Sequence, residues 1–332
     1  MRQEHFIARH RQSWDDFAHW LAERGERPRA ARKQRDWRGL RDEEVPSLYR
    51  KICQQLALAR RRGYSPQVTG RLQDLMQRGH NALYRNAPTR WRAALAFLGG
   101  GFPRLVRSQW PCMLVSLVLF ALPLVTMFVV LQSRPELVHA VFSPEHLGEL
   151  ESMYNPADSD NKLGRDSGTD LAMFGHYIYN NISIGFQTFA SGLLAGVGSA
   201  LVLVMNGVII GSAAGHIQHI GYGDPFWRFV AGHGSFELTA IVIAGGAGLQ
   251  LGLNLLAPGN RRRRDALVEA GKRGGLLSLG VLAMLVVAAF IEAFWSSIGS
   301  LPASVKFSVG GVLWIVVLTW LWRGGRGQSD AA

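Results

Sequence analysis

Hydrophobic residues along this 332-residue chain follow two patterns. In residues 1–100 the apolar positions recur every three or four residues among charged ones, which predicts short amphipathic helices. Three such helices are indicated, with apolar positions at Phe6, Trp14, Phe17 and Leu21, at Val45, Leu48, Ile52 and Leu56, and at Val68, Leu72, Leu75 and Leu83. From residue 110 onward the apolar runs are long enough to cross a bilayer.

These longer runs predict six membrane-spanning helices. They lie at 110–131, 171–190, 193–215, 236–257, 276–298 and 304–322. The run at 171–190 carries many polar residues, so the alternative is five spans with 171–185 as an interfacial helix. The predicted fold is therefore all-α: a polytopic helical membrane protein, with a helical domain at 1–100 and a transmembrane domain at 101–332.

The distribution of charged residues predicts the orientation of the transmembrane domain in the membrane. Residues 1–108 hold 23 Lys/Arg against 10 Asp/Glu, residues 259–275 hold 6 against 2, and residues 132–170 hold 3 against 8. Loops rich in Lys/Arg stay in the cytoplasm, so the N-terminal domain is expected inside and the acidic segment 132–170 outside. An odd number of crossings must then separate 132–170 from the four arginines at 261–264, which favours six spans. Topology accounts for the basic excess, and no nucleic-acid partner is expected.

Glycines within the predicted spans indicate close helix packing. Gly207, Gly211 and Gly215 recur every four residues, and Gly245, Gly248 and Gly252 follow a similar spacing. Lipid gives no hydrophobic drive for helix association, so membrane helices associate through small residues and through interhelical hydrogen bonds.

Nine polar or ionisable residues fall in or beside the apolar runs. They are His176, Asn180, Asn181, Asn206, His233, Glu237, Gln250, Asn254 and Glu292. A buried polar group without a hydrogen bond costs several kcal/mol. We therefore expect these residues to form an intramembrane polar network that cross-links helices. The alternative is a transporter's substrate site, where polar groups meet glycine-broken helices near mid-membrane.

His233 and Glu237 also raise the hypothesis of a metal site. Residues four apart share one helix face, and with His176 or Glu292 this pair could offer nitrogen and oxygen ligands to zinc. No HExxH motif is present, so whether they bind metal stays open, and no cofactor is otherwise expected. The sequence contains no GxSxG motif and no phosphate-binding loop. It therefore favours a protein that is not an enzyme over a metal-dependent intramembrane hydrolase.

Three blocks of the sequence resemble a known family. They are FGHYIYNNISIGFQTFASG at 174–192, LVLVMNGVIIG at 201–211 and HGSFELTAIVIAGGAGLQLG at 233–252. Together they resemble the stage II sporulation protein M family, in the longer form found in Gram-negative bacteria. The basic N-terminal domain, with LARRRGYSP at 58–66, is also similar to this longer form.

The resemblance implies a scaffold rather than an enzyme. It implies a bacterial inner-membrane protein of the cell envelope that holds partner proteins. Relatives of the longer form are typically encoded near MoxR-type AAA+ ATPases and von Willebrand A-domain proteins, which implies a complex serviced by an ATPase. We therefore expect a homo-oligomeric inner-membrane scaffold that couples cytoplasmic partners to envelope functions. A transporter or lipid-handling protein with a polar intramembrane site is the alternative.

Overall fold

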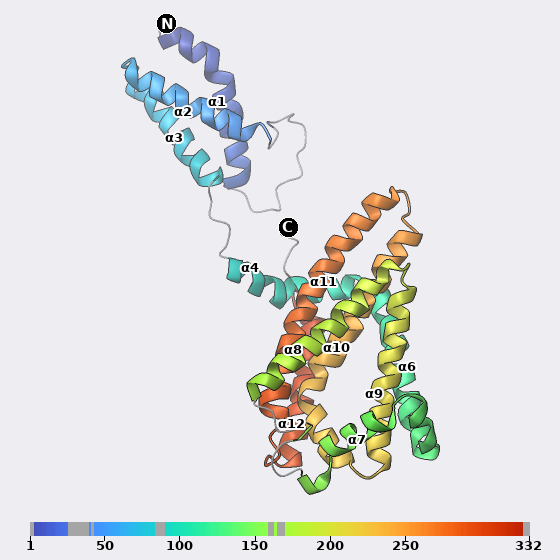
Figure 1. The fold of residues 1–332 in the computed structure, drawn as a ribbon. Coiled ribbons are helices and arrows are strands. Elements are labelled where there is room, and N and C mark those ends of the chain that lie inside the picture. Colours follow the sequence, from blue (N-terminus) through green and yellow to red (C-terminus); the bar gives the residue numbers. More distant parts are fainter. Residues whose placement is uncertain are drawn as a thin grey trace. The chain divides into compact units, whose positions relative to one another are not determined.

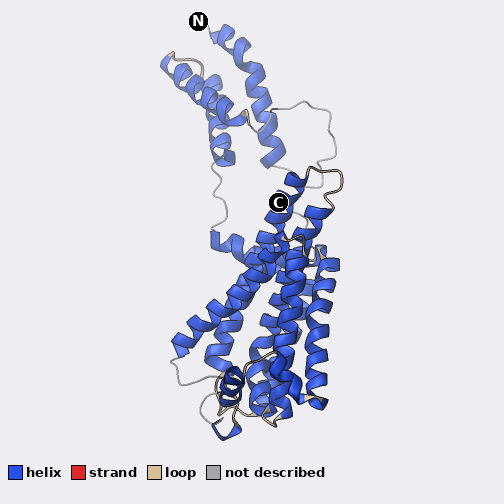
Figure 2. Ribbon diagram, turned by 45° about the vertical axis from the view of Figure 1, so that its right-hand side comes forward, coloured by secondary structure: helices blue, strands red, loops and turns tan. Residues whose placement is uncertain are grey.

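The described part of the chain is mostly helical and contains no strand (Figures 1 and 2). The computed structural model describes residues 3–25, 40, 43–83, 90–158, 163–164 and 170–327. Parts of the predicted acidic segment, at 159–162 and 165–169, lie outside these residues. The chain divides into two compact units, Met1–Arg92 and Ala93–Ala332.

The first unit contains three helices around a core of their own. They are α1 (Gln3–Gly25), α2 (Val45–Arg61) and α3 (Pro66–Leu83). The buried core includes Phe6, Trp14, Phe17, Ile52, Leu56, Leu72 and Leu75. The Nε1 atom of Trp14 donates a hydrogen bond of 2.7 Å to Gln55 Oε1, which ties α1 to α2. The N-terminal unit is thus all-α.

The second unit contains a bundle of long helices with shorter elements at its two ends. Its elements are α4 (Arg90–Ala96), η2 (Phe97–Gly101), α5 (Phe102–Ser108), α6 (Trp110–Ser133), η3 (Pro135–Ala140), α7 (Pro144–Met153), η4 (Pro156–Asp158), α8 (Asp170–Ala190), η5 (Ser191–Leu193), α9 (Val197–His219), α10 (Gly223–Leu256), α11 (Arg263–Ile291), η6 (Glu292–Ser296) and α12 (Ala303–Arg323). The chain is an all-α polytopic membrane protein, as the sequence predicts.

Five helical segments in the described residues are long and apolar enough to cross a membrane. They are Trp110–Ser133, Val197–His219, Gly223–Leu256, Arg263–Ser296 and Ala303–Arg323. Helix α8 has 21 residues but is not among these five segments. Length and composition therefore do not identify α8 as a span. The contacts of α8 with the other helices indicate whether it crosses the bilayer.

Helices α6 and α9 lie parallel in close contact. A Cβ atom added at Gly207 would overlap the carbonyl oxygen of Phe120, and one added at Gly211 would overlap that of Leu124. Residue numbers therefore rise together along the two helices, so both run in the same direction. Two parallel spans require the chain to return through the bilayer between them. This geometry supports the sixth crossing.

Helix α8 has the position that this return requires. Near its start, the ring centroid of Phe174 lies 6.1 Å from that of Phe290. Near its end, Phe189 packs against Gly274, where a Cβ would meet the ring at 2.6 Å. The interval from 290 to 274 on α11 is about 24 Å at 1.5 Å per residue. Helix α8 thus runs along α11 for a distance that is most of the thickness of a hydrocarbon core, which is about 30 Å.

Helix α10 is the central helix of the bundle. It packs against α6, α8, α9, α11 and α12. It begins at Gly223, 13 residues before the predicted start at 236. Residues 223–235 look like a polar-aromatic link in the sequence, but Phe226 and Phe229 are buried against neighbouring helices, which keeps this segment helical. His233 therefore lies inside the helix.

The two ends of the bundle differ in charge. The basic end carries residues 99–111, 190–197, 256–264 and 320–327, including the arginines at 261–264. The acidic end carries residues 133–158, 219–223 and 296–303. At the basic end, Arg107 donates hydrogen bonds to the carbonyls of Leu321 and Gly324, at 2.5 and 2.6 Å. This contact fixes α5 against the end of α12.

Changing Gly211 to alanine is predicted to destabilise the bundle. The added methyl group would collide with the backbone of α6, and overpacking of this kind costs roughly 1–3 kcal/mol. Gly271→Ala in α11 is the matched control, because a Cβ there meets nothing within 4 Å. Thermal unfolding of both variants in detergent measures the difference. Equal melting temperatures would contradict the close contact.

The sixth crossing predicts which side of the membrane each loop faces. In a chain whose Cys53 and Cys112 are replaced by serine, single cysteines at Leu194 and Gly259 are expected to react with an impermeant maleimide from the same side. A cysteine at Glu145 is expected to react from the other side. If Leu194→Cys reacts together with Glu145→Cys, then α8 does not cross.

Candidate functional site

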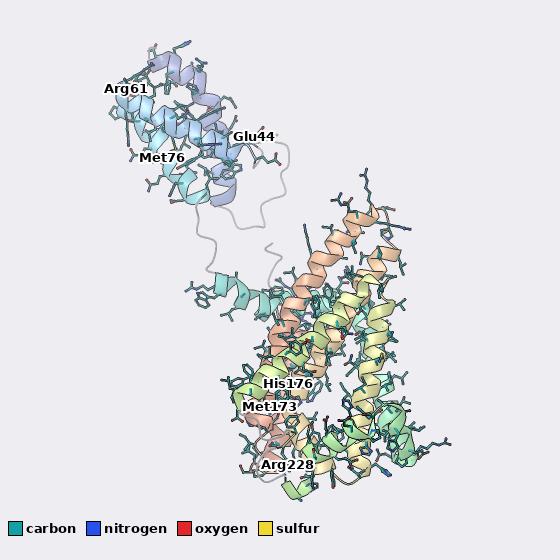
Figure 3. The ribbon with its side chains drawn as sticks, in the orientation of Figure 1. Glu44, Arg61, Met76, Met173, His176 and Arg228 are labelled. Atoms are coloured by element: carbon teal, nitrogen blue, oxygen red, sulfur yellow. The ribbon has the colours of Figure 1, made fainter. Side chains whose placement is uncertain are left out.

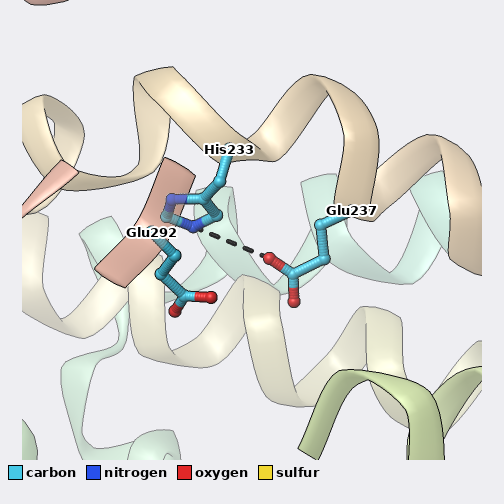
Figure 4. Close-up of side chains that lie close together, drawn as sticks. All are labelled: His233, Glu237 and Glu292. Carbon is cyan, nitrogen blue, oxygen red and sulfur yellow. Dashed lines mark ion pairs between the residues drawn. The ribbon is translucent and has the colours of Figure 1, made fainter. Parts of the chain in front are cut away.

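Three ionisable side chains meet inside the bundle, toward its acidic end. His233 and Glu237 come from α10, and Glu292 begins η6 (Figure 4). One ligand-type atom from each lies within 4.8 Å of the other two. The spacing of four residues puts His233 and Glu237 on one face of α10, with Nε2 of the histidine 3.6 Å from Glu237 Oε2. We call these three residues the His–Glu–Glu cluster.

A π-helical turn places Glu292 in this cluster. Helix α11 ends at Ile291, and residues Glu292–Ser296 continue it as the wider turn η6. Both Glu292 and Ser296 are buried against neighbouring helices. Such turns often occur at functional sites within helices. Their position is hard to predict because nothing in the local composition requires one here.

Hydrogen bonds hold the cluster from outside. Ser296 Oγ lies 3.1 Å from His233 Nδ1, so the opposite ring nitrogen, Nε2, faces the carboxylates. Asn181 Nδ2 of α8 donates to Glu292 Oε2 at 3.4 Å. Asn180 Nδ2 in turn donates to Asn181 Oδ1 at 3.1 Å. A chain of polar contacts therefore runs from α8 to the cluster.

Aromatic residues cover the cluster on its acidic-end side. The ring of Phe229 lies edge-on to His233, with 5.1 Å between centroids. Tyr154 packs against Phe226 and Phe229. Burial raises the pKa of Tyr154 well above its usual value, and the nearby Glu292 carboxylate raises it further, so its hydroxyl stays neutral. The cluster is thus shielded from water on this side.

Two cations lie near the cluster but bind other groups. Lys306 Nζ donates to the carbonyl of Ser296 at 2.5 Å and lies 5.6 Å from the ring centroid of Trp295. Arg228 donates to the carbonyls of Gly299 and Leu301, at 2.6 and 2.7 Å. Among the described residues, neither forms an ion pair with Glu237 or Glu292. Both instead fix the turn between η6 and α12.

The nine polar residues proposed from the sequence occupy several places. The structure brings Asn181, His233, Glu237 and Glu292 together. It leaves Asn180 and His176, which is labelled in Figure 3, on the exposed face of α8. Asn206 donates to Val202 O in its own helix, and Asn254 donates to Gln250 O. Gln250 is buried, and its Oε1 has no hydrogen-bond partner among the described residues.

Three residues of this region were not expected from the sequence: Ser296, Lys306 and Tyr154. Lys306 could have been found, because it is the one basic residue in the apolar run at 304–322 and an ionisable residue inside a span suggests a function. Ser296 and Tyr154 offered no comparable signal.

Comparison with protein families places this region within a known family. The family model described as "Stage II sporulation protein M" matches residues 116–297. That is more than half of the chain. The chain belongs to this family. The match includes α8, α9, α10 and the whole His–Glu–Glu cluster, so these elements lie within the part that family members share.

A second model matches the N-terminal unit. It covers residues 4–85 and is described as "Domain of unknown function (DUF8413)". Comparisons with curated proteins and with solved structures gave no match. The sporulation protein M match thus identifies the membrane unit, and the N-terminal match is consistent with the longer form of the family.

Replacing Asn181 is predicted to destabilise the bundle more than replacing another asparagine in the spans. Asn181→Ala would leave the buried Glu292 carboxylate without its hydrogen-bond donor, which costs about 1–3 kcal/mol. Asn206→Ala is the matched control, because Asn206 bonds only a carbonyl of its own helix among the described contacts. Denaturation in mild detergent gives both values. Equal losses would show that the Asn181 contact contributes nothing.

Proposed function

We propose that this protein is a scaffold of the bacterial inner membrane that assembles as a homodimer through α8. The observation that carries the proposal is a row of exposed polar side chains on that helix. Family membership supports the proposal, because the family resemblance implies a membrane scaffold.

One face of α8 is polar, and none of the residues that the structure describes covers it. His176, Asn180, Ser183 and Gln187 are exposed and follow one another at intervals of four, three and four residues. This spacing puts them on one side of the helix, and we call them the α8 stripe. The opposite side is buried against the bundle, through Tyr177, Asn181, Gly185 and Thr188. Helix α8 therefore has one face packed within the bundle and one polar face without cover.

A polar stripe at this depth needs hydrogen-bond partners. Tyr179 and Phe186 flank the stripe and are 76% and 67% exposed, as expected of a lipid-facing helix. Hydrocarbon offers no hydrogen bonds to the amide, hydroxyl and imidazole groups between them. Amide and hydroxyl side chains both donate and accept, so the stripe is complementary to itself. A second copy of the same helix satisfies it.

The membrane fixes the geometry of that dimer. Two copies share one orientation in the bilayer, so the two-fold axis relating them runs along the membrane normal. The two α8 helices then run parallel, and a residue near the axis faces the same residue of the partner. Asn180 would meet Asn180 of the partner subunit, and Ser183 would meet Ser183 of the partner subunit.

Charge supports a cytoplasmic position for the basic end. The arginines at 261–264, together with Arg104, Arg107, Arg323 and Arg326, flank the spans at this end, and basic flanks stay inside. The chain before Trp110 then lies in the cytoplasm, and the acidic end faces the envelope. The N-terminal unit has its own core and exposes Arg60, Arg61 and Arg62. We propose it as the docking module for cytoplasmic partners, a MoxR-type AAA+ ATPase system among them.

Transport is the second candidate function. It is favoured by the side chain of Glu237, which is 18% exposed although it lies among the central helices. A transporter would use the α8 stripe and the cluster to line a polar path. It predicts a monomer that moves a solute or lipid across vesicles.

Cysteine crosslinking tests the dimer. In a chain whose Cys53 and Cys112 are replaced by serine, Asn180→Cys and Ser183→Cys are expected to form disulfide-linked dimers in native membranes under mild oxidant. Leu201→Cys on α9 is the matched control, because it is similarly exposed but lies outside the stripe. A triple variant, N180L/S183A/Q187L, is expected to fold and to migrate as a monomer in mild detergent, because it removes most of the polar groups of the stripe.

The triple variant also separates the two functions. The scaffold account predicts that this variant loses a purified AAA+ partner that the wild-type chain retains. Crosslinking no stronger at 180 and 183 than at 201 would rule out the α8 dimer. A monomeric wild-type chain that carries solute flux would favour the transporter.

A further inference from the structure

We infer that the His–Glu–Glu cluster binds one divalent transition-metal ion, with zinc as its preferred occupant. The ligands would be Nε2 of His233 and one carboxylate oxygen each of Glu237 and Glu292. This inference is independent of the proposed α8 dimer and scaffold function.

The first argument is charge. Two carboxylates lie close together in a site where Glu292 is buried and the Glu237 side chain is only 18% exposed. Removing carboxylates from water is costly unless a positive charge lies between them. The nearby cations, Lys306 and Arg228, are held by backbone carbonyls instead. The cluster therefore needs a cation or a proton of its own.

The second argument is ligand geometry. Zinc bonds to nitrogen and oxygen are 2.0–2.2 Å long, which places neighbouring tetrahedral ligand atoms roughly 3.3 Å apart. The distance from His233 Nε2 to Glu237 Oε2 is 3.6 Å, and all three ligand atoms lie within 4.8 Å of one another. Rotation of the glutamate side chains would bring the three ligand atoms to the separation that a tetrahedral zinc site requires. Three protein ligands leave a fourth zinc position open.

The third argument is the set of groups behind the ligands. A histidine that binds a metal usually engages its other ring nitrogen in a hydrogen bond, which orients the ring. Here Ser296 Oγ engages Nδ1, and Nε2 is directed at the carboxylates. Asn181 holds one oxygen of Glu292. His233 is nine-tenths buried, and its Nε2 has no hydrogen bond within 3.5 Å among the described residues.

The ligand types select the class of metal. Imidazole suits zinc and other transition metals, whereas sites for magnesium and calcium are usually built from oxygen alone. One nitrogen and two oxygens therefore favour zinc, with manganese as the competitor to test. The competing account is a proton shared between Glu237 and Glu292, with no metal.

Metal analysis and titration test the inference on the full-length protein. The protein is purified in mild detergent, stripped with a chelator, dialysed and titrated with zinc chloride or manganese chloride. We expect one zinc ion per chain by elemental analysis, a higher melting temperature with zinc, and weaker binding of manganese. Co²⁺ bound in place of zinc should absorb visible light. The positions of its d–d absorption bands depend on the ligand atoms, so they should indicate nitrogen and oxygen ligands.

Three variants locate the site. Glu237→Gln and Glu292→Gln keep the size of the side chain and are expected to weaken zinc binding at least tenfold. Glu151→Gln is the matched control, because Glu151 pairs with His216 outside the cluster, and it should bind zinc as the wild type does. If the cluster variants misfold, the cobalt spectrum of the wild-type protein decides alone. A wild-type protein without zinc, without a melting shift and without a cobalt spectrum would overturn the inference in favour of the shared proton.

Discussion

Water is absent from the core of a bilayer, and this single constraint shapes the whole membrane unit. Each polar group at that depth must find its partner within the protein or in a second copy of it. The backbone meets the requirement through helices, and glycine lets those helices approach closely enough for interhelical contacts to form. The parallel pair α6 and α9 is joined in this way at Gly207 and Gly211. Two parallel spans predict a return of the chain between them, so a local contact bears on the topology of the whole unit.

The same constraint underlies both the proposed α8 dimer and the proposed metal site, although each proposal rests on its own observations. Asn180 belongs to the exposed α8 stripe, and Asn181 beside it faces inward. Asn180 donates to Asn181, which donates to Glu292 of the cluster. A polar path therefore joins the surface proposed for dimerisation to the site proposed for metal.

Much of the fold follows from residue patterns, because long apolar runs allow few structures in a membrane. The run at 110–131 closely predicts α6, and the glycines at 207 and 211 predict a close helix contact. The start of α10 was missed because Phe226 and Phe229 are buried by tertiary packing, which local composition does not report. The sequence predicts the three cluster residues as candidates. It does not predict that they lie close together, because that depends on the π-helical turn that begins at Glu292. Which of Asn180 and Asn181 faces inward was likewise inaccessible, because adjacent residues of one helix differ by 100° in direction and only packing fixes that rotation.

The most direct test of the central claim, that polar side chains at bilayer depth assemble this protein, is the mass of the intact wild-type particle. Native mass spectrometry on protein released from lipid nanodiscs, without prior detergent extraction, would measure it. We expect a particle of two 36.6 kDa chains that persists at low protein concentration. A particle of one chain, under conditions in which a known membrane dimer stays intact, would contradict the account.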